Sequence, residues 1–265
     1  MKKITLIGGD IRIKILKQRL EEAGYTTDTL GLFENDAADL KTSDAVIMPV
    51  PTTKDRKTVF TPLTKRNIFL SDISEAVSDR TPILCCNYSF YGKNSIDYGS
   101  LDGYSLLNAV PTAEGAIKLA IEQTPFTLWK SRVLVIGYGR VGKILADRLA
   151  KLGCRVTVSA RKTADFCMLD ALGFEYMNTC DLNKSGLPFD IIFNTVDVHV
   201  IDDEVWQNSE CTLAVDLSSL GGFSLSAAEK AGIRAVKAPG LPGIVAPHTA
   251  ADILFKTVKE ILEKW

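Results

Sequence analysis

Apolar residues along this chain form two patterns, short continuous runs and longer stretches with an apolar residue every three or four positions. Short runs are typical of strands buried on both faces, and the wider spacing is typical of amphipathic helices. In the first part of the chain the pattern predicts helices at 11–23 and 73–77, a loop at 87–103, and strands at 3–7, 26–30, 44–50 and 82–86. Strands that alternate with helices indicate a parallel α/β domain.

The alternation resumes in the second part of the chain. It predicts helices at 140–152, 164–172 and 225–231, and strands at 133–137, 155–160, 174–177, 190–196, 212–217 and 233–237. We expect Pro111 to open a connecting helix that runs to Thr124, because proline suits a first helical turn. The proline- and glycine-rich stretch from Pro239 to Pro247 predicts a loop, and an amphipathic helix follows from Thr249.

A glycine-rich turn joins the predicted strand at 133–137 to the helix that follows it. Gly137, Gly139 and Gly142 give the spacing G-x-G-x-x-G, and strand, turn, helix and second strand together are typical of a Rossmann dinucleotide-binding domain. The first glycine allows a tight turn, the second lets a pyrophosphate approach the backbone, and the third lets the helix pack close to the sheet. The N–H groups at the helix start then face the phosphates.

The residues at the end of the second strand of this unit favour NADP. An NAD site usually carries Asp or Glu there, about 20 residues beyond the glycines, to bind the ribose 2′-OH. This chain reads Ser159-Ala160-Arg161-Lys162 instead. Two charge-assisted hydrogen bonds to a 2′-phosphate, at roughly 1.5–3 kcal/mol each, favour NADP over NAD by about two to four orders of magnitude. A solvated basic loop is the alternative interpretation.

We expect the cofactor to contact the glycine turn, the helix start, the end of the second strand, and the ends of two later strands that approach the nicotinamide ribose. The residues are Gly137, Tyr138, Gly139, Arg140, Val141, Gly142, Ser159, Ala160, Arg161, Lys162, Asn194, Thr195, Val196, Leu217 and Ser218.

The order of the elements predicts two domains. A terminal helix that follows a complete nucleotide-binding domain often returns to cover the first domain. We therefore expect a discontinuous N-terminal α/β domain (1–124 with 248–265) and a Rossmann domain (125–247), with the last helix packed on the N-terminal domain.

Composition narrows the classes of protein further. The 265 residues allow two modest domains, and the formal net charge of −1, without long runs of one sign, argues against binding to nucleic acid or to an anionic membrane. The six cysteines are scattered and form no Cys/His cluster. We therefore expect no metal site, and reduced thiols in a cytoplasmic protein.

Several segments together resemble the A subunit of dipicolinate synthase, and they span nearly the whole chain. They are IGGDIR, DAVIMPVP, LLNAVPTAEGAIKLAIEQT, VLVIGYGRVGKILA, VTVSARK, DLSSLGG and APGLPGIVAP-x-TA, of which the last is the most specific. The resemblance implies a flavodoxin-like domain before the Rossmann domain. It also implies an NADP-dependent dehydrogenase that makes pyridine-2,6-dicarboxylate, a spore metabolite, from a cyclic lysine-pathway intermediate, hydroxy-tetrahydrodipicolinate. A flavoprotein-like B subunit is the implied partner, and a homo-oligomer is left open.

Candidate residues for substrate and proton transfer lie outside the glycine turn. The candidate substrate-binding residues are Asp10, which is also the expected N-cap of the first helix, Arg12 in its first turn, and Thr112. Arg12 and Thr112 are expected to hold the carboxylates of a small dicarboxylate substrate. His248 and Glu114 are the candidate catalytic acid–base residues.

Three interpretations of the function stay open. His248 also resembles the catalytic histidine of D-2-hydroxyacid dehydrogenases, but Ser218-Ser219-Leu220 stands where those enzymes need an arginine. A non-catalytic NADP-binding scaffold is a third possibility. The chain also departs from the dipicolinate synthase pattern at His248, where a lysine is expected, at Asp197, where a proline is expected, and at Ser219-Leu220. A paralogue that acts on another small dicarboxylate therefore remains an alternative.

Overall fold

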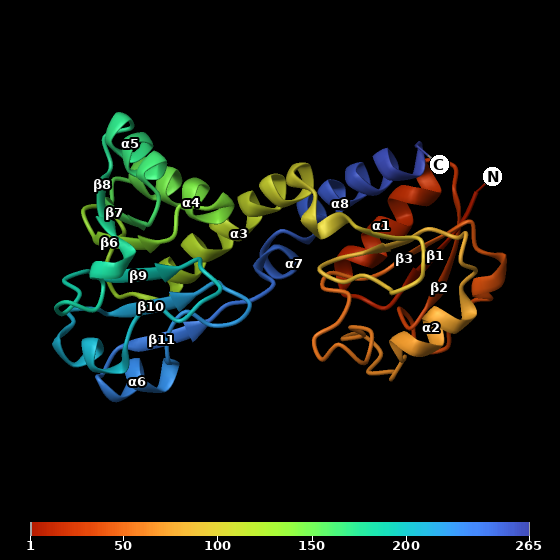
Figure 1. Cartoon of the computed structure of the whole chain (residues 1–265), viewed down its shortest axis with the longest axis horizontal. Helices are drawn as coiled ribbons and strands as arrows, with labels where there is room; N and C mark the ends of the chain where they lie inside the picture. The colour runs from red at the N-terminus through yellow and green to blue at the C-terminus, as the bar shows by residue number, and fades with distance from the viewer. Residues whose placement is uncertain (1, 265) are drawn as a thin grey trace. The chain divides into compact units, whose positions relative to one another are not determined.

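The computed structural model describes residues 2–264, which divide into two compact units (Figure 1). One unit contains the chain up to Asn108 and resumes at Ala246, and the other spans Ala109–Val245. Each unit is built on its own parallel sheet.

The first unit has a five-stranded sheet with the order β2-β1-β3-β4-β5, and all its strand pairs are parallel. This is the flavodoxin-like order, which the sequence resemblance implied. The strands are β1 (Lys3–Ile7), β2 (Thr26–Leu30), β3 (Ala45–Ile47), β4 (Ile83–Cys85) and β5 (Ser95–Asp97). β5 lies in the segment predicted to be a loop, and that prediction was wrong because a half-buried edge strand needs no apolar run.

Helices α1 (Ile11–Glu22) and α8 (Pro247–Leu262) pack in one hydrophobic cluster with the strands of this sheet. Helix α2 (Leu70–Ala76) belongs to a second cluster, which contains side chains from the other face of β1. Arg19 of α1 also pairs with Asp252 of α8 at 2.8 Å. The prediction that the last helix packs on the N-terminal domain is confirmed. Short 3-10 helices lie at Leu40–Thr42 and Tyr98–Ser100.

The second unit has a six-stranded parallel sheet with the order β11-β10-β9-β6-β7-β8. This is the Rossmann order, with the reversal between β6 and β9, where dinucleotides bind. The strands are β6 (Arg132–Ile136), β7 (Arg155–Ala160), β8 (Glu175–Asn178), β9 (Ile191–Asn194), β10 (Leu213–Asp216) and β11 (Arg234–Lys237). The helices are α4 (Arg140–Lys151), α5 (Thr163–Ala171) and α6 (Leu225–Lys230), with 3-10 helices at Thr179–Asp181 and Asp203–Asn208.

Helix α3 (Asp102–Gln123) is continuous and contains Pro111, so the prediction that Pro111 opens the helix was wrong. Proline removes one backbone hydrogen bond, but Ala113, Ala116 and Ala120 bury a stripe of small side chains in the core of the second unit. This packing sustains the helix through the proline. It also explains why the boundary between the units falls after residue 108, inside α3, and not at residue 124 as expected.

A short helix, α7 (Leu241–Val245), interrupts the stretch at 239–247 that was expected to be a loop. Pro242 is its second residue, a first-turn position at which the missing proline N–H is no loss. The loop prediction was wrong for these residues because a proline in the first turn does not prevent a helix from starting.

Candidate functional site

The three glycines after β6 meet three different spatial requirements. Gly137 has φ +98°, and a Cβ there would lie 2.6 Å from Val196 and 2.7 Å from Thr195. A Cβ on Gly142 would lie 2.0 Å from the carbonyl oxygen of Gly137, so only glycine lets the helix approach the turn this closely. A Cβ on Gly139 would meet nothing within 4 Å. Gly139 therefore leaves open the space through which a pyrophosphate would approach the backbone.

The N-terminus of α4 suits an anion. Gly139 is its N-cap, and no side chain caps the helix, so the N–H groups of the first turn lack an intrahelical partner. Arg140 and Val141 occupy this turn at the surface and half-buried, respectively. Tyr138 is buried beside the turn, with the Lys143 ammonium 5.0 Å from its ring centre. The helix start has the features of a phosphate-binding site.

The end of β7 presents Arg161 and Lys162 to solvent. Within residues 2–264 neither side chain has a hydrogen-bond or ion-pair partner, so both are available to an anion. Ser159 and Ala160 are buried, and the Ser159 hydroxyl lies 3.2 Å from that of Thr179. The Ser159 side chain thus has a partner within the protein, and its expected contact with the cofactor stays a prediction.

The end of β9 carries residues that are expected to bind the cofactor, and their polar side chains form hydrogen bonds within the protein. Asn194 is fully buried, and its amide donates to the carbonyl of Val196 (2.9 Å) and to Asp216 Oδ1 (2.8 Å). The Thr195 hydroxyl donates to the carbonyl of Ile136 at 2.8 Å. Both polar side chains are thus satisfied within the protein. The expected contacts of Asn194 and Thr195 with the cofactor stay predictions.

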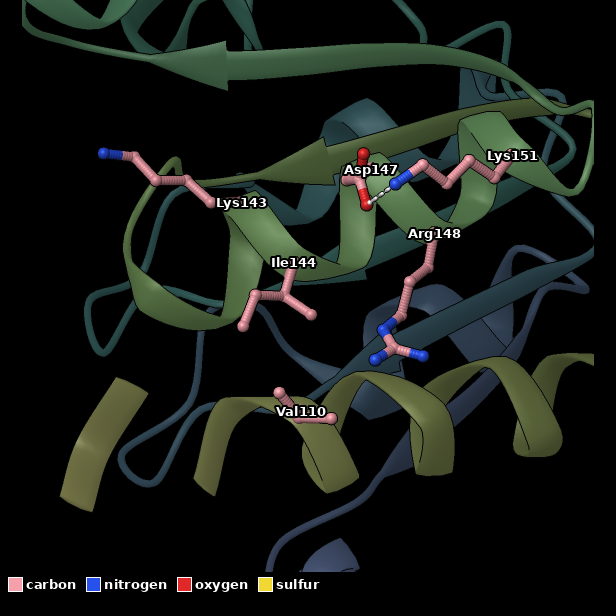
Figure 2. Close-up of a pocket in the computed structure, with 6 residues that line it drawn as sticks. All are labelled: Val110, Lys143, Ile144, Asp147, Arg148 and Lys151. Atoms are coloured by element: carbon pink, nitrogen blue, oxygen red, sulfur yellow. Dashed lines mark hydrogen bonds and ion pairs between the residues drawn. The ribbon is translucent and has the colours of Figure 1, made fainter. Parts of the chain in front are cut away.

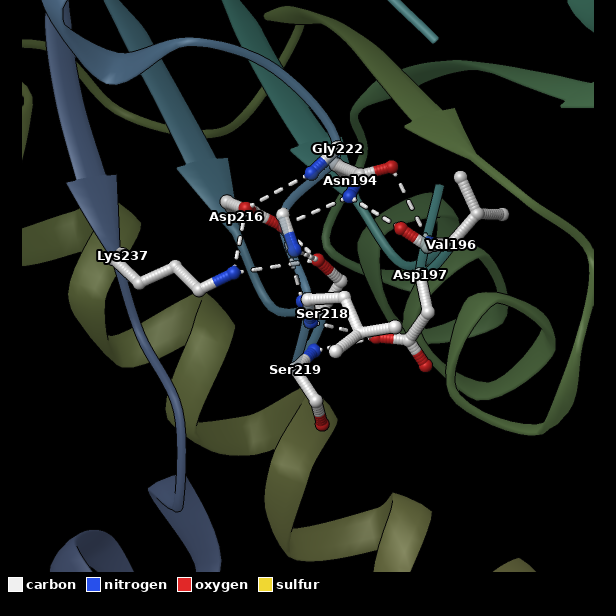
Figure 3. Close-up of polar contacts among 10 residues, drawn as sticks. Asn194, Val196, Asp197, Asp216, Ser218, Ser219, Gly222 and Lys237 are labelled. Atoms are coloured by element: carbon white, nitrogen blue, oxygen red, sulfur yellow. Dashed lines mark hydrogen bonds and ion pairs between the residues drawn. The ribbon is translucent and has the colours of Figure 1, made fainter. Parts of the chain in front are cut away.

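Leu217 and Ser218, which directly follow β10, are also expected to bind the cofactor. Ser218 is 5% exposed, and its hydroxyl donates to Asp216 Oδ1 at 2.6 Å and accepts from the Gly221 N–H at 3.0 Å (Figure 3). Leu217 is half-buried against the hydrophobic core of the unit. Asp216 holds the Ser218 side chain, and the expected contacts of Leu217 and Ser218 with the cofactor stay predictions.

Asp216 is the functional-site residue that the sequence analysis missed. Its carboxylate is 1% exposed and lies 2.8 Å from the Lys237 ammonium, and it also accepts from the Gly222 N–H at 3.1 Å. Burial opposes ionisation of Asp216, but the hydrogen bonds from Lys237, Ser218 and Asn194 outweigh burial and hold its pKa below the usual value. The sequence gives one sign of Asp216, which is that an acidic residue ends an apolar run and that two glycines, Gly221 and Gly222, follow it after four residues.

Glu114 lies away from the glycine turn. Its carboxylate accepts from Arg148 at 2.6 Å, and both side chains are partly exposed. Arg148 belongs to the last part of α4, about 13 Å along the helix axis from Gly139 at 1.5 Å per residue. Glu114 is a partner in a surface ion pair, and its role as a catalytic acid or base stays a prediction.

A surface groove of about 540 Å³ lies beside this ion pair, between α3 and α4. Figure 2 shows Arg148 extending from α4 towards α3, where Val110 lines the groove. Asp147 and Lys151 on its rim pair with each other at 2.8 Å. Thr112 is half-buried on the part of α3 that belongs to this unit.

Arg12 belongs to the other unit and is 4% exposed, not solvated. Its Nε donates to Asp10 Oδ1 at 2.9 Å, and its Nη2 donates to Asp10 Oδ2 at 2.7 Å and to the carbonyl of Val50 at 2.6 Å. Asp10 also caps α1 through the Arg12 N–H, so its predicted N-cap role is confirmed. The remaining nitrogen, Nη1, makes no hydrogen bond with the described residues. Arg12 and Thr112 lie in different units.

His248 is exposed in the first turn of α8, one residue before the predicted helix start. It belongs to the first unit, whereas Glu114 belongs to the second. Among the described residues no group of three or more His, Cys, Asp or Glu side chains could hold a metal ion. No helix built from residues 2–264 is long and apolar enough to cross a membrane.

Comparison with known proteins identifies the family. Residues 3–101 match the family model of the N-terminal domain of the dipicolinate synthase A subunit. The dipicolinate synthase A subunit of Bacillus subtilis (strain 168) is 31% identical over 286 aligned positions, and the alignment covers 98% of this chain and 95% of that protein. The crystal structure of the dipicolinate synthase A subunit from Bacillus halodurans matches with a TM-score of 0.88 and 29% identity, over 98% of this chain and 97% of that one.

More distant structures share the fold alone. D-lactate dehydrogenase from Escherichia coli matches with a TM-score of 0.61 and 15% identity, over 99% of this chain and 97% of that one. The relative from Bacillus subtilis, by contrast, is similar along both units. The chain therefore belongs to the family of dipicolinate synthase A subunits.

Proposed function

We propose that this chain is the NADP-dependent dehydrogenase component of a dipicolinate synthase, which converts hydroxy-tetrahydrodipicolinate to pyridine-2,6-dicarboxylate. The observation that carries the proposal is the similarity to the Bacillus subtilis relative over 98% of the chain, together with the open, uncapped glycine turn. The conversion needs loss of one water, transfer of one hydride and release of one proton, which leaves an aromatic ring. Aromatisation makes the overall step favourable.

The proposed cofactor is NADP, and the argument rests on the end of β7. Arg161 and Lys162 are exposed there without partners among the described residues, and no acidic residue stands in the segment 159–162. A carboxylate at this place would repel a 2′-phosphate and bind the 2′-OH of NAD. The helix start at Gly139 would hold the pyrophosphate.

When bound, the nicotinamide supplies the hydride acceptor, and the protein supplies orientation and charge. Arg12 is the proposed holder of a substrate carboxylate. Asp10 and the Val50 carbonyl fix its guanidinium in advance, so little conformational freedom is lost when Nη1 meets an anion. Thr112 is the proposed second contact, and His248 is the proposed proton acceptor, because its side chain is exposed and an imidazole nitrogen can accept a proton.

The proposed setting is the cytoplasm of a sporulating cell, where the lysine pathway supplies the cyclic substrate. The proposed partner is a flavoprotein-like B subunit. Self-association of the chain is proposed as a further possibility that gel filtration can decide.

The test is an assay of the purified chain with freshly prepared hydroxy-tetrahydrodipicolinate and NADP⁺, with and without the B subunit. We expect NADPH and pyridine-2,6-dicarboxylate to form in equal amounts. Arg12→Lys should raise the KM for the substrate, because it loses the guanidinium fork that suits a carboxylate.

Two other outcomes would replace the proposal. Reduction of NAD(P)⁺ with a D-2-hydroxyacid, but not with the cyclic substrate, would support the D-2-hydroxyacid dehydrogenase interpretation. Binding of NADPH without turnover under any of these conditions, with or without the B subunit, would support a scaffold.

A further inference from the structure

Polar side chains cluster at the carboxyl ends of β9, β10 and β11. β6, β7 and β8 form the half that carries the glycine turn and the basic residues for the adenosine phosphate. In a Rossmann domain each half binds one mononucleotide. The cluster therefore lies at the carboxyl end of the half of the sheet that would bind the nicotinamide mononucleotide.

The Asp216 carboxylate joins three segments that are far apart in the sequence (Figure 3). It accepts from Asn194 at the end of β9, from Ser218 and Gly222 in the turn after β10, and from Lys237 at the end of β11. All of these distances lie between 2.6 and 3.1 Å. Because both carboxylate oxygens accept hydrogen bonds, Asp216 holds the turn at 218–222 in place relative to the ends of the strands.

A second carboxylate holds the same turn from the surface. Asp197 is exposed and accepts from the N–H of Ser219 at 2.5 Å and of Leu220 at 3.2 Å. The turn is also packed tightly, since a Cβ on Gly222 would lie 2.0 Å from Asn194 Nδ2. Asp216 accepts from the backbone N–H groups at the two ends of the turn, Ser218 and Gly222, and Asp197 accepts from those in its middle. Together they fix its backbone without any ligand.

We propose that Asp216 and Lys237 are positioning residues that fix the turn at 218–222 for the nicotinamide half of the dinucleotide. The inference rests on the proposed binding of NADP. The Asp216 side chain is 1% exposed and the Lys237 side chain is 29% exposed, so the carboxylate is shielded from solvent and the lysine is only partly shielded. Its role is to hold the backbone of the turn, and it makes no contact with the reacting atoms.

The test measures two ligands with the full-length protein. NADPH carries the nicotinamide half, and adenosine 2′,5′-bisphosphate lacks it. Lys237→Met should weaken NADPH binding about ten- to a hundredfold, the range that corresponds to the loss of one charge-assisted hydrogen bond, and should leave the affinity for adenosine 2′,5′-bisphosphate unchanged. Lys237→Arg, which keeps the charge next to Asp216, should restore most of the NADPH affinity.

Controls separate this effect from a general loss of stability. Lys230→Met changes an exposed lysine on α6 of the same unit and should alter neither affinity. Ser218→Ala removes the 2.6 Å bond to Asp216 without leaving a buried charge unpaired, so it supplies the measurement if Lys237→Met does not fold. It should also weaken NADPH selectively.

Equal weakening of both ligands, or unchanged NADPH binding in both Lys237→Met and Ser218→Ala, overturns the positioning role and leaves the proposed function intact. Absence of binding of either ligand to the wild-type protein overturns the proposed function and this inference together.

Discussion

Gly142→Ala should lower the stability of the protein, whereas Gly139→Ala should keep the stability and weaken NADPH binding. The two substitutions add the same methyl group three residues apart. A Cβ at Gly142 would lie 2.0 Å from the carbonyl oxygen of Gly137 and 3.0 Å from its carbonyl carbon. Backbone atoms cannot move aside as a side chain can, so α4 must shift by more than about 1 Å. Overpacking of this kind costs roughly 1–3 kcal/mol of the free energy of unfolding.

The methyl group at Gly139 meets nothing in the free protein, and φ there is −82°, an ordinary value for alanine. Stability should therefore be unchanged or rise by about 0.4–1 kcal/mol. The methyl group does occupy the approach to the helix N-terminus. Losing one charge-assisted hydrogen bond to the pyrophosphate, at about 1.5–3 kcal/mol, weakens binding roughly ten- to a hundredfold.

Thermal unfolding of both variants, followed by NADPH titration of each, checks this pair of expectations. The reasoning is refuted if Gly142→Ala unfolds at the wild-type temperature. It is equally refuted if Gly139→Ala binds NADPH as tightly as the wild type, since no phosphate would then pass close to this backbone.

Two further substitutions test the roles of Glu114 and Asp216. Glu114→Gln removes a partly exposed ion pair with Arg148, which contributes about 0–1 kcal/mol to stability, so kcat and KM should stay at wild-type values. A large loss of kcat would instead show that Glu114 is a catalytic residue. The lowered pKa of Asp216 adds stability that is present above the unfolded-state pKa of about 3.9 and is lost as the pH falls through the folded-state pKa. In urea unfolding between about pH 6 and pH 3, Asp216→Asn should therefore show a shallower loss of stability with falling pH than the wild type, and an equal slope would contradict the assignment.

Most of the fold could be predicted from the sequence because its strands are short apolar runs between turn residues. The failures share a cause, which is that packing between distant segments overrides a local preference. Pro111 lies inside α3 because the alanine stripe after it is buried. Ser95–Asp97 becomes an edge strand through pairing with β4, although its own residues give little sign of a strand.

The candidate site was predictable where one residue type is required by its own backbone or by close packing. Gly137 and Gly142 are such positions, and the structure shows why no side chain fits. Asn194 and Ser218 were placed at the correct strand ends, but their direction depends on Asp216, which is far from Asn194 in the sequence. Which polar side chains at a strand end face inward is decided by such pairings, and a single sequence does not contain them.

The measurement that tests the central claim most directly is a fluorescence titration of the purified chain with NADPH and with NADH. Arg161→Ala is the test variant, and Arg155→Ala is the matched control, because Arg155 is exposed at the opposite end of the same strand, β7. We predict tighter binding of NADPH than of NADH, loss of most of this difference in Arg161→Ala, and no change in Arg155→Ala. Equal affinity of the wild type for both dinucleotides, or no binding of either, would contradict the account.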